Sequence, residues 1–478
     1  MSISRGQQYI DSLKDDRNVW LDTEKIDVTS HSAFNGTLLT IKKLFDMLDD
    51  SSSREQVGFK SPTTGEYVHN AFMVPRNCED LMARSKAFAF WAESTNGVMS
   101  RLSDYARSRL TGWYATREYY RKYDNQFAEK IEQYFVEARD RNLFLTAVQR
   151  EPQINRSASW GEQNEDAVLR IVRKCSEGVV VRGAKMIATA GPYTNDFIVY
   201  PVQKIPSSAQ ECATMLIVPA NSKGLHILCR EAFFSTSSED HPLSFQYDEM
   251  DAVLFFDDVL VPWERVLLYD NPEALWEIRL NEASNSLAYH QTIVRLVVKL
   301  EFVAGIAFRI AEAIGVEKYL NVQEQLGELV SQIESIRALV LASEREASLD
   351  SYGNFLPNFR YIETARNLGT RYYPRAIEIL KQIGAGGYFQ MPSSMGDMRG
   401  PLSALTEKYL QGTNMEAMER VKLFKLAWDL VGSPLGSRHE LYERYYAGDP
   451  VRLFANQYIN YDKTRVMHKV NKLIEGNY

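Results

Sequence analysis

Two polar side chains in the segment SRLSDYARS have a spacing that suits joint chemistry. Arg101 and Tyr105 lie four residues apart. On a helix, residues at this spacing share a face. If Ser103 instead caps the helix, Arg101 precedes the first turn and Tyr105 lies within it. Either arrangement brings a guanidinium and a phenol to one small volume, as a binding or catalytic pair requires; the alternative is an exposed Arg and a half-buried Tyr without a shared role.

A second polar cluster, QINR, lies at the start of a β-rich stretch. Arg156 can pair with an anionic or phosphate group, and the amides of Gln153 and Asn155 can serve the polar edge of a ring. The alternative is an ordinary loop before a strand. The residues alone leave both interpretations open.

A third cluster, GSPLGSRHELYE, contains Gly436, Ser437, Arg438 and His439. Small residues that expose backbone amides beside an Arg can cradle a phosphate or another anionic group. The same glycines and serines are also typical of one helix ending and another beginning. The two interpretations are compatible.

Two single residues complete the set of candidates. Thr189, in KMIATAG, offers a hydroxyl that can donate or accept a hydrogen bond, although a Thr in a strand is also explained by β-propensity. His290, in AYHQT, has a side chain whose ordinary pKa of about 6.5 suits a base near neutral pH. The alternative is a histidine packed between helices.

The elements that position these residues fall into three zones. Apolar residues recur at three- and four-residue steps from about residue 35 to 143 and again from about 275, which predicts helices. Between them lie short β-branched runs such as GVVVRGAKMIAT and DAVLFFDDVLVPW, which predict antiparallel strands. We therefore expect an α+β protein with an N-terminal helical domain (1–143), a central β domain (144–272) and a C-terminal helical bundle (273–478).

Composition and motifs exclude several other classes. The 478 residues carry a net charge of −7, so no overall positive field attracts nucleic acid or an anionic membrane. No apolar stretch is long and uncharged enough to span a bilayer. The N-terminal residues lack the apolar core of a secretory signal, and four scattered cysteines without a CxxC pair favour a reduced, cytoplasmic setting without a metal site. Rossmann and P-loop motifs are absent.

Several segments, in the same order along nearly the whole chain, resemble the 4-hydroxyphenylacetate 3-hydroxylase family of flavin-dependent monooxygenases. They are RGQQYIDSLKDDRNVWLDTEKIDVTSHSAF, EPQINRS, VVVRGAKMIATAG, HPLSFQYDEMDAVLFFDDVLVPWERV, AYHQTIVRLVVKLEFVAG and VGSPLGSRHELYERYYAGDP. The resemblance implies an acyl-CoA-dehydrogenase-like fold and a homotetramer.

The resemblance also implies a reaction in aromatic compound metabolism. A separate flavin reductase supplies reduced FAD by diffusion, FAD reacts with dioxygen, and the resulting flavin hydroperoxide hydroxylates a phenol. A dry cavity is needed because water entry favours loss of hydrogen peroxide.

The resemblance assigns roles to the candidate residues. It places Arg101 and Tyr105 against the phenolic oxygen and the flavin edge, and Thr189 against the reactive nitrogen of the flavin. It assigns 153–156 and 436–439 to FAD binding.

One position departs from the family. Members that act on 4-hydroxyphenylacetate carry a His aimed at the phenolic oxygen, where this chain has Ala147. Alanine can neither accept a proton nor form a side-chain hydrogen bond. The branch that attacks chlorophenols and nitrophenols also lacks that His and keeps one equivalent to His290, to which we assign the base role. Tyr105 and the SRHELYERYYAG segment resemble the 4-hydroxyphenylacetate branch instead, so the substrate is left open between halo- or nitrophenols, 4-hydroxyphenylacetate and a biosynthetic phenol.

Two other functions are carried as alternatives. One is an acyl-CoA dehydrogenase-like flavoprotein that oxidises a thioester, which needs a carboxylate base that no matching motif supplies. The other is a non-catalytic, flavin-binding helical oligomer.

Overall fold

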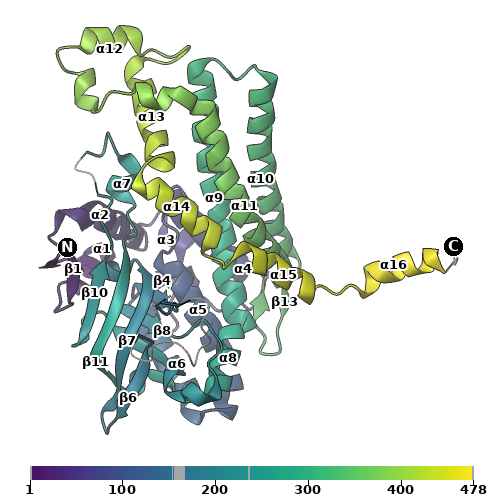
Figure 1. The fold of residues 1–478 in the computed structure, drawn as a ribbon. Helices are drawn as coiled ribbons and strands as arrows, with labels where there is room; N and C mark the ends of the chain where they lie inside the picture. The colour runs from purple at the N-terminus through teal and green to yellow at the C-terminus, as the bar shows by residue number, and fades with distance from the viewer. Residues whose placement is uncertain (1–2, 153, 156–166, 235–236, 476–478) are drawn as a thin grey trace.

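The computed structural model describes residues 3–152, 154–155, 167–234 and 237–475. In this part of the chain, helices precede and follow a central pair of β-sheets (Figure 1). The predicted α+β, acyl-CoA-dehydrogenase-like class is confirmed. The exact domain boundaries stay predictions.

Short helices make up most of the N-terminal region. Asn77 shows why one of them begins where it does: its side chain accepts a hydrogen bond from the backbone N–H of Asp80, and two acidic residues occupy the first turn. The helices are α1 (Arg5–Ser12), α2 (Ser32–Asp46), α3 (Arg54–Val57), α4 (Cys78–Glu93), α5 (Ser103–Ala115) and α6 (Asn125–Asp140), with single 3₁₀ turns at Asn70–Phe72 and Arg117–Lys122.

Two sheets form the centre of the molecule. The larger has the strand order β2-β1-β10-β11-β7-β6 and the smaller β12-β9-β8-β5. Their strands are β1 (Val19–Leu21), β2 (Glu24–Ile26), β5 (Leu145–Val148), β6 (Arg170–Lys174), β7 (Gly178–Thr189), β8 (Asp196–Val199), β9 (Met215–Pro219), β10 (Leu225–Cys229), β11 (Asp251–Pro262) and β12 (Val266–Leu268). A separate hairpin pairs β3 (Gly58–Lys60) with β4 (Tyr67–His69).

The sheets differ from the prediction in two ways. The strands β1 and β2 come from the region predicted to be helical, because three-residue strands are too short to produce a periodic signal. The pairs β1–β10 and β5–β8 are parallel, whereas an antiparallel sheet was predicted. Each parallel pair joins strands far apart in sequence, and β1 thereby covers an edge of β10 that would otherwise be open.

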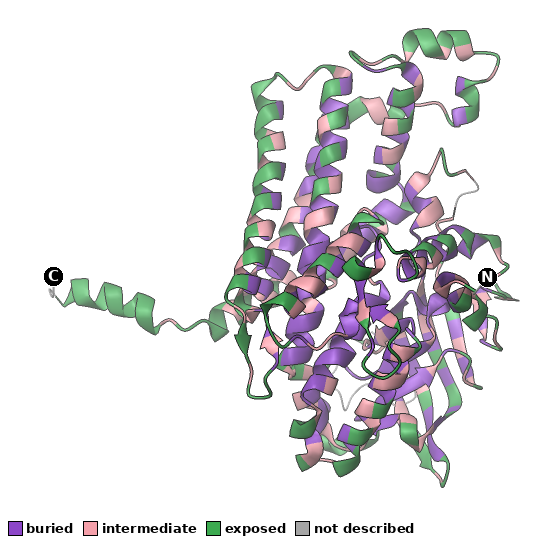
Figure 2. Ribbon diagram, turned by 180° about the vertical axis from the view of Figure 1, so that it is seen from behind, coloured by how far each residue is buried: buried purple, intermediate pink, exposed green. Residues whose placement is uncertain are grey.

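Long helices dominate the C-terminal region, as predicted. In Figure 1, α9, α10 and α11 run side by side, and α14 crosses from them toward the sheets. The helices are α7 (Pro242–Gln246), α8 (Pro272–Leu280), α9 (Glu282–Ile314), α10 (Leu320–Arg345), α11 (Phe359–Gly384), α12 (Ser403–Tyr409), α13 (Ala417–Val431), α14 (Pro434–Tyr445), α15 (Pro450–Asn460) and α16 (Thr464–Ile474); a short hairpin joins β13 (Ser348–Leu349) to β14 (Phe355–Leu356). Figure 2 shows α9 largely buried and α16 exposed on all sides. None of the helices in the described ranges is long and apolar enough to cross a membrane.

One close helix crossing links the N-terminal and C-terminal regions. A Cβ on Gly112 of α5 would lie 2.3 Å from the Cα of Ser284 in α9. Only glycine therefore permits this approach. The crossing holds α5 against α9, and each helix contributes a tyrosine, Tyr105 and Tyr289, to one cavity.

Candidate active site

A cavity of about 450 Å³ lies where the N-terminal helices, the sheets and the C-terminal helices meet. Its polar lining residues are Arg101, Tyr105, Thr146, Gln149, Arg150, Thr189, Asp251, Arg279, Tyr289, Arg366, Arg438, Tyr442, Tyr445 and Tyr446. Four predicted site residues, Arg101, Tyr105, Thr189 and Arg438, are thus brought together, although they come from three separate stretches of sequence. Ala147 also lines the cavity.

Arg101 and Tyr105 form a stacked pair at the start of α5. The helix begins at Ser103 without a side-chain cap, so Arg101 precedes it and Tyr105 lies in its first turn. The Ser103 hydroxyl does not cap the helix; it accepts a hydrogen bond of 2.7 Å from the backbone N–H of Leu145, which ties α5 to β5. The guanidinium carbon of Arg101 lies 3.9 Å from the centre of the Tyr105 ring. The predicted convergence of the two side chains is confirmed.

The Arg101 guanidinium is also enclosed by Tyr442 of α14 and by Tyr446, the residue that follows this helix. Its carbon lies 5.6 Å from the ring centres of both Tyr442 and Tyr446, whose rings stack 5.0 Å apart. The Nη1 atom of Arg101 is buried and has no hydrogen-bond partner among the described residues. A buried donor without a partner indicates an acceptor that a ligand would supply.

Thr189 reaches the cavity from an irregular end of β7. The pairing between β7 and β11 shifts register just before it, and Ile187 adopts a left-handed φ of 59°, which is rare for a β-branched residue. Such bulges redirect side chains beside functional sites. The Thr189 hydroxyl donates a hydrogen bond of 2.6 Å to Oδ1 of Asp251.

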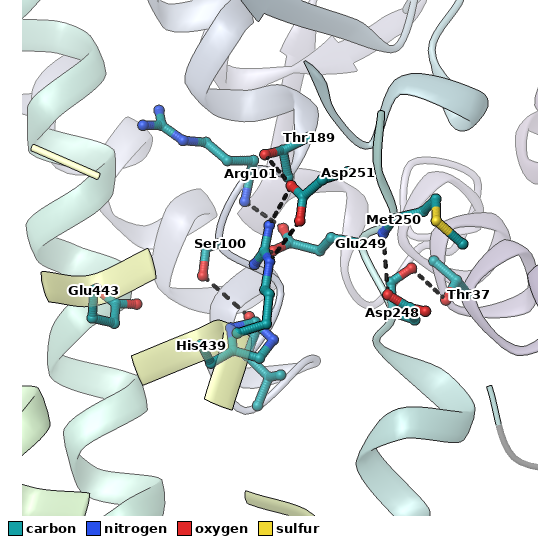
Figure 3. A network of polar contacts seen from close by, with 12 residues as sticks. Thr37, Ser100, Arg101, Thr189, Asp248, Glu249, Met250, Asp251, His439 and Glu443 are labelled. Atoms are coloured by element: carbon teal, nitrogen blue, oxygen red, sulfur yellow. Dashed lines mark hydrogen bonds and ion pairs between the residues drawn. The ribbon is translucent and has the colours of Figure 1, made fainter. Parts of the chain in front are cut away.

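Arg438 joins α14 to the start of β11 through two carboxylates. Its guanidinium donates to both oxygens of Asp251, at 2.8 and 2.9 Å, and to Oε2 of Glu249 at 2.9 Å. Figure 3 shows Thr189, Asp251, Glu249 and Arg101 grouped around this junction. Glu249 is connected to Arg101 as well, because its Oε1 accepts from the Arg101 backbone N–H.

The two carboxylates beside Arg438 respond differently to burial. Burial alone raises the pKa of each, but Arg438, Arg230 and the Thr189 hydroxyl together hold the pKa of Asp251 well below its ordinary value. For Glu249, burial outweighs Arg438, and its pKa is raised. Asp251 therefore supplies the fixed negative charge at this end of the cavity.

His290 does not line the cavity, which corrects the prediction that it takes the phenolic proton. Its side chain is fully buried, and Nε2 lies 2.8 Å from Oε1 of Glu344. The preceding residue, Tyr289, faces the cavity instead. Because one residue step turns an α-helix by about 100°, neighbours in α9 face different partners. The alternative of a histidine packed between helices is the one the structure shows.

Of the segment 436–439, only Arg438 lines the cavity. Ser433 caps α14 by accepting from the backbone N–H of Gly436, and a Cβ on Gly436 would lie 2.2 Å from the carbonyl oxygen of Leu430 in α13. Ser437 is exposed. The predicted helix end and helix start are confirmed, and the glycine serves this close helix contact.

His439 is fully buried and is not among the residues that line the cavity. Its Nδ1 lies 3.2 Å from Nζ of Lys299. Burial, together with the charges of Lys299 and Arg438, holds its pKa well below the ordinary value. The structure therefore places His439 in the packing of α14 rather than at the cavity wall.

The QINR cluster is only partly described. Gln153 and Arg156 lie outside the described residues, and their roles stay predictions. Asn155 is exposed and is not among the residues that line the cavity. Its cofactor role also stays a prediction.

Several lining residues were not singled out from the sequence. Tyr442 and Tyr446 follow Arg438 at steps of four residues, which places the three side chains on one side of a helix. This spacing could have identified the two tyrosines from the sequence. Tyr289 adjoins His290, but only the orientation of α9 distinguishes the two. No sequence signal pointed to Arg279 or Arg366. Within the described ranges, no group of three His, Cys, Asp or Glu side chains could hold a metal ion.

Comparisons with known proteins agree with this geometry. The family models for the N-terminal and C-terminal parts of 4-hydroxyphenylacetate 3-hydroxylase match residues 5–268 and 280–475. The chain is 36% identical to the 4-hydroxyphenylacetate 3-monooxygenase oxygenase component of Thermus thermophilus, covering 98% of this chain and 97% of that protein. It is 31% identical to the oxygenase component of 4-nitrophenol 2-monooxygenase of a Rhodococcus species, covering 93% and 86%.

A solved structure extends the likeness to three dimensions. The oxygenase component of 4-hydroxyphenylacetate 3-monooxygenase, in complex with FAD and 4-hydroxyphenylacetate, superimposes with a TM-score of 0.94 at 35% identity over 99% of both chains. The matches span both halves of the chain in the order predicted from its segments. The chain therefore belongs to the 4-hydroxyphenylacetate 3-hydroxylase family.

Proposed function

We propose that this protein is the oxygenase component of a two-component monooxygenase that hydroxylates a phenol with reduced FAD and dioxygen. The observation that carries the proposal is the stacked pair of Arg101 and Tyr105 in a cavity shared with Thr189 and Arg438. Relatives over the whole chain are named as oxygenase components of phenol monooxygenases.

The residues of the cavity fit a flavin. Thr189 offers a hydroxyl that can change its hydrogen-bonding role, Arg438 offers a guanidinium at the wall, and the buried Nη1 of Arg101 lacks a partner among the described residues. These three residues would hold the flavin ring. When bound, reduced FAD would supply the electrons that activate dioxygen.

The chain itself provides an electric field that favours an ionised phenol. Burial raises the pKa of Tyr105, but the charges of Arg101 and Arg109 outweigh it, and the net shift is downward. A substrate hydroxyl beside Arg101 experiences the same charges. Because an opposite charge nearby favours the ionised form, Arg101 would lower the pKa of the phenol and enrich its ring in electrons.

This field offers an account of the alanine at position 147. Neither Ala147 nor the buried His290 provides a base at the cavity wall. A phenol whose pKa is lowered by Arg101 can release its proton to water as it enters, so a dedicated histidine is not required. The apolar wall that Ala147 contributes also helps to keep water out.

We also propose the partners implied by the family. A separate flavin reductase would supply reduced FAD, and the protein would form a homotetramer. The exposed helix α16 (Figure 2) supports association, because Val466, Val470, Leu473 and Ile474 lie on one side of it and are each 45–77% exposed. Four free cysteines fit a reducing compartment such as the cytoplasm.

The test combines the purified protein with NADH, FAD, a flavin reductase and a panel of phenols, with hydroxylated product measured. We expect the wild type to form product and Arg101→Gln to lose roughly 100-fold or more in turnover, the usual cost of removing a donor to a developing oxyanion. Arg121→Gln, at an exposed ion pair, is the matched control and should match the wild type. Absence of product from every phenol contradicts the proposal. Bleaching of the flavin by an acyl-CoA under anaerobic conditions would indicate that the protein oxidises a thioester. Absence of flavin binding would indicate a non-catalytic scaffold.

A further inference from the structure

Thr189 and Asp251 are direct partners across two strands of the larger sheet. Thr189 ends β7 and Asp251 begins β11, and the register of these antiparallel strands sets the two residues opposite each other. Side chains at opposite positions of a sheet lie on the same face, close enough to interact. Both residues line the cavity. The hydrogen bond of 2.6 Å between them is therefore set by the pairing of the strands.

The Asp251 carboxylate is surrounded by donors. Its Oδ1 accepts from Nη2 of Arg438 at 2.8 Å as well as from Thr189, and its Oδ2 accepts from Nε of Arg438 at 2.9 Å and from Nε of Arg230 at 3.2 Å. An ionised carboxylate has about four acceptor positions and no donor. Despite burial, these neighbours hold the pKa of Asp251 well below its ordinary value. Asp251 is therefore ionised at neutral pH and can only accept.

This environment fixes the direction of the Thr189 hydroxyl. A threonine hydroxyl taken by itself has one proton to donate and can also accept. Beside an ionised carboxylate, that proton is committed to Asp251, and only the lone pairs of the hydroxyl oxygen are left. No described residue donates a hydrogen bond to this oxygen. At the cavity wall, Thr189 therefore presents an acceptor.

Building on the proposed function, in which Thr189 faces the flavin ring, we propose that Asp251 is a positioning residue that fixes the Thr189 hydroxyl as an acceptor toward the cavity. An acceptor at this wall matches a ring nitrogen that carries a hydrogen and opposes one that presents a lone pair. The reactive ring nitrogen of a flavin carries a hydrogen in the reduced form and presents a lone pair in the oxidised form. Asp251, acting through Thr189, thereby distinguishes the two oxidation states of the ring.

Asp251→Asn tests this role, because an amide has donors as well as an acceptor. Arg438 and Arg230 both donate toward this position, so the amide oxygen should face the two guanidinium groups and the amide N–H should face Thr189. The Thr189 hydroxyl would then accept from the introduced amide and donate into the cavity. The preference between the two forms of the flavin should change accordingly.

The readout is a ratio of two dissociation constants, that of oxidised FAD divided by that of reduced FAD. Oxidised FAD is titrated into the protein by fluorescence, and FAD reduced with dithionite is titrated anaerobically by calorimetry. We expect Asp251→Asn to lower this ratio by roughly tenfold or more, because a matched hydrogen bond to the reduced ring is exchanged for a pair of opposed donors. The reduction potential of the bound flavin should fall with the ratio.

A second substitution separates the hydrogen bond from the charge of Asp251. Reduced flavin is anionic at neutral pH, so the loss of a nearby negative charge favours it and, through space alone, raises the ratio. In a Thr189→Val background, which has no hydroxyl, Asp251→Asn should therefore leave the ratio unchanged or raise it. In a Thr189→Ser background, which keeps the hydroxyl, Asp251→Asn should lower the ratio as it does in the wild type.

The matched control is Asp258→Asn, on the same strand at an exposed ion pair with Arg182, which should leave both dissociation constants unchanged. If Asp251→Asn does not fold, as judged by circular dichroism, Asp251→Glu tests the same role. It keeps the negative charge but displaces the carboxylate by one methylene from the Thr189 hydroxyl, so the ratio should again fall.

The outcomes distinguish this inference from the proposed function. An unchanged ratio in Asp251→Asn, or a fall of equal size in the Thr189→Val background, overturns the role of Asp251. If such a protein still hydroxylates a phenol, the monooxygenase itself is left intact. Failure of the wild type to bind either form of FAD would overturn both the proposed function and the role of Asp251.

Discussion

Two groups of buried cations packed against α9 behave in opposite ways. Between α9 and α14, Arg295 and Lys299 surround Glu443, which accepts hydrogen bonds from both at 2.8–3.1 Å. Despite burial, these cations lower the pKa of Glu443 to about 2. At the cavity wall, by contrast, Arg366 of α11 faces the ring of Tyr289, and no carboxylate of the described chain pairs with it. Burial of an arginine therefore does not by itself identify a functional site; a missing counterion at the wall of a cavity is the stronger indication.

A third arginine shows that a counterion is not the only structural solution. Arg107 of α5 is buried and donates to the carbonyl oxygens of Asn142 and Leu143 at 2.8–3.0 Å. Burial lowers its pKa to about 9. This guanidinium serves the packing of α5 against the start of β5, and its donors are largely used within the chain. Arg101, Arg279 and Arg366 differ from Arg107 because they also have unpartnered donors but line a ligand-sized cavity.

The largest expected effect comes from breaking the cluster of Arg295, Lys299 and Glu443, which we call the balanced cluster. Glu443→Gln leaves Arg295 and Lys299 buried without a counterion, and we expect the free energy of unfolding to fall by about 3–5 kcal/mol. Urea unfolding followed by circular dichroism measures it. The pKa of Glu443 is lowered in the folded state, so its stabilisation is present above its ordinary pKa of about 4.5 and is lost as pH falls toward 2.

Glu440→Gln is the matched control in the same helix. Glu440 lies at a partly exposed position beside Arg444, where an ion pair contributes less than about 1 kcal/mol. A Glu443→Gln variant no less stable than Glu440→Gln would show that the α9–α14 cluster is not balanced by its carboxylate, and the contrast with Arg366 at the cavity wall would fail.

A smaller effect distinguishes His290 from its neighbour Tyr289. His290→Ala removes the partner of Glu344, which then keeps the Ser85 hydroxyl at 2.5 Å. We expect the free energy of unfolding to fall by about 1–3 kcal/mol, which is the cost of leaving a buried polar group without a partner. The ratio of turnover between weakly acidic phenols and nitrophenols should stay unchanged. His290→Gln, which keeps a donor toward Glu344, should recover part of the stability.

Selective slowing of weakly acidic phenols in His290→Ala would contradict this account. It would restore His290 as the base and remove the distinction between the two adjacent residues of α9. Product formation at several phenol concentrations gives the required ratio.

The smallest effect is a change in the pH dependence of stability. The pKa of His439 is held well below its ordinary value, so the unfolded chain binds a proton below about pH 6.5 that the folded protein does not. Stability therefore falls as pH decreases from this value. His439→Gln should reduce that slope by up to about 1.4 kcal/mol per pH unit. His69 is also buried with a lowered pKa, and its contribution to the slope should remain in the His439→Gln variant. The free energy of unfolding, measured at about pH 7 and pH 5.5, tests this prediction. An unchanged slope would show that His439 does not interact with the charges of the balanced cluster.

Local patterns predicted a large part of the fold. Helical periodicity marked α9, α10 and α13, and the GSP sequence marked the break between α13 and α14, because capping and turn preferences act over a few residues. The pairing of Arg101 with Tyr105 was predictable for the same reason, since both lie within one turn. Short strands such as β1 carried no comparable signal, and their pairing depends on a distant strand.

The sequence alone determined the order of helical and β regions and the types of side chain available to the site. Only the tertiary structure decided that Tyr289 rather than His290 faces the cavity, and that Arg366 and Arg279 meet there. The physical reason is that an α-helix changes the direction of its side chains by about 100° at each residue, while the contact that selects a face, such as Gly112 against Ser284, is made between segments far apart in the chain.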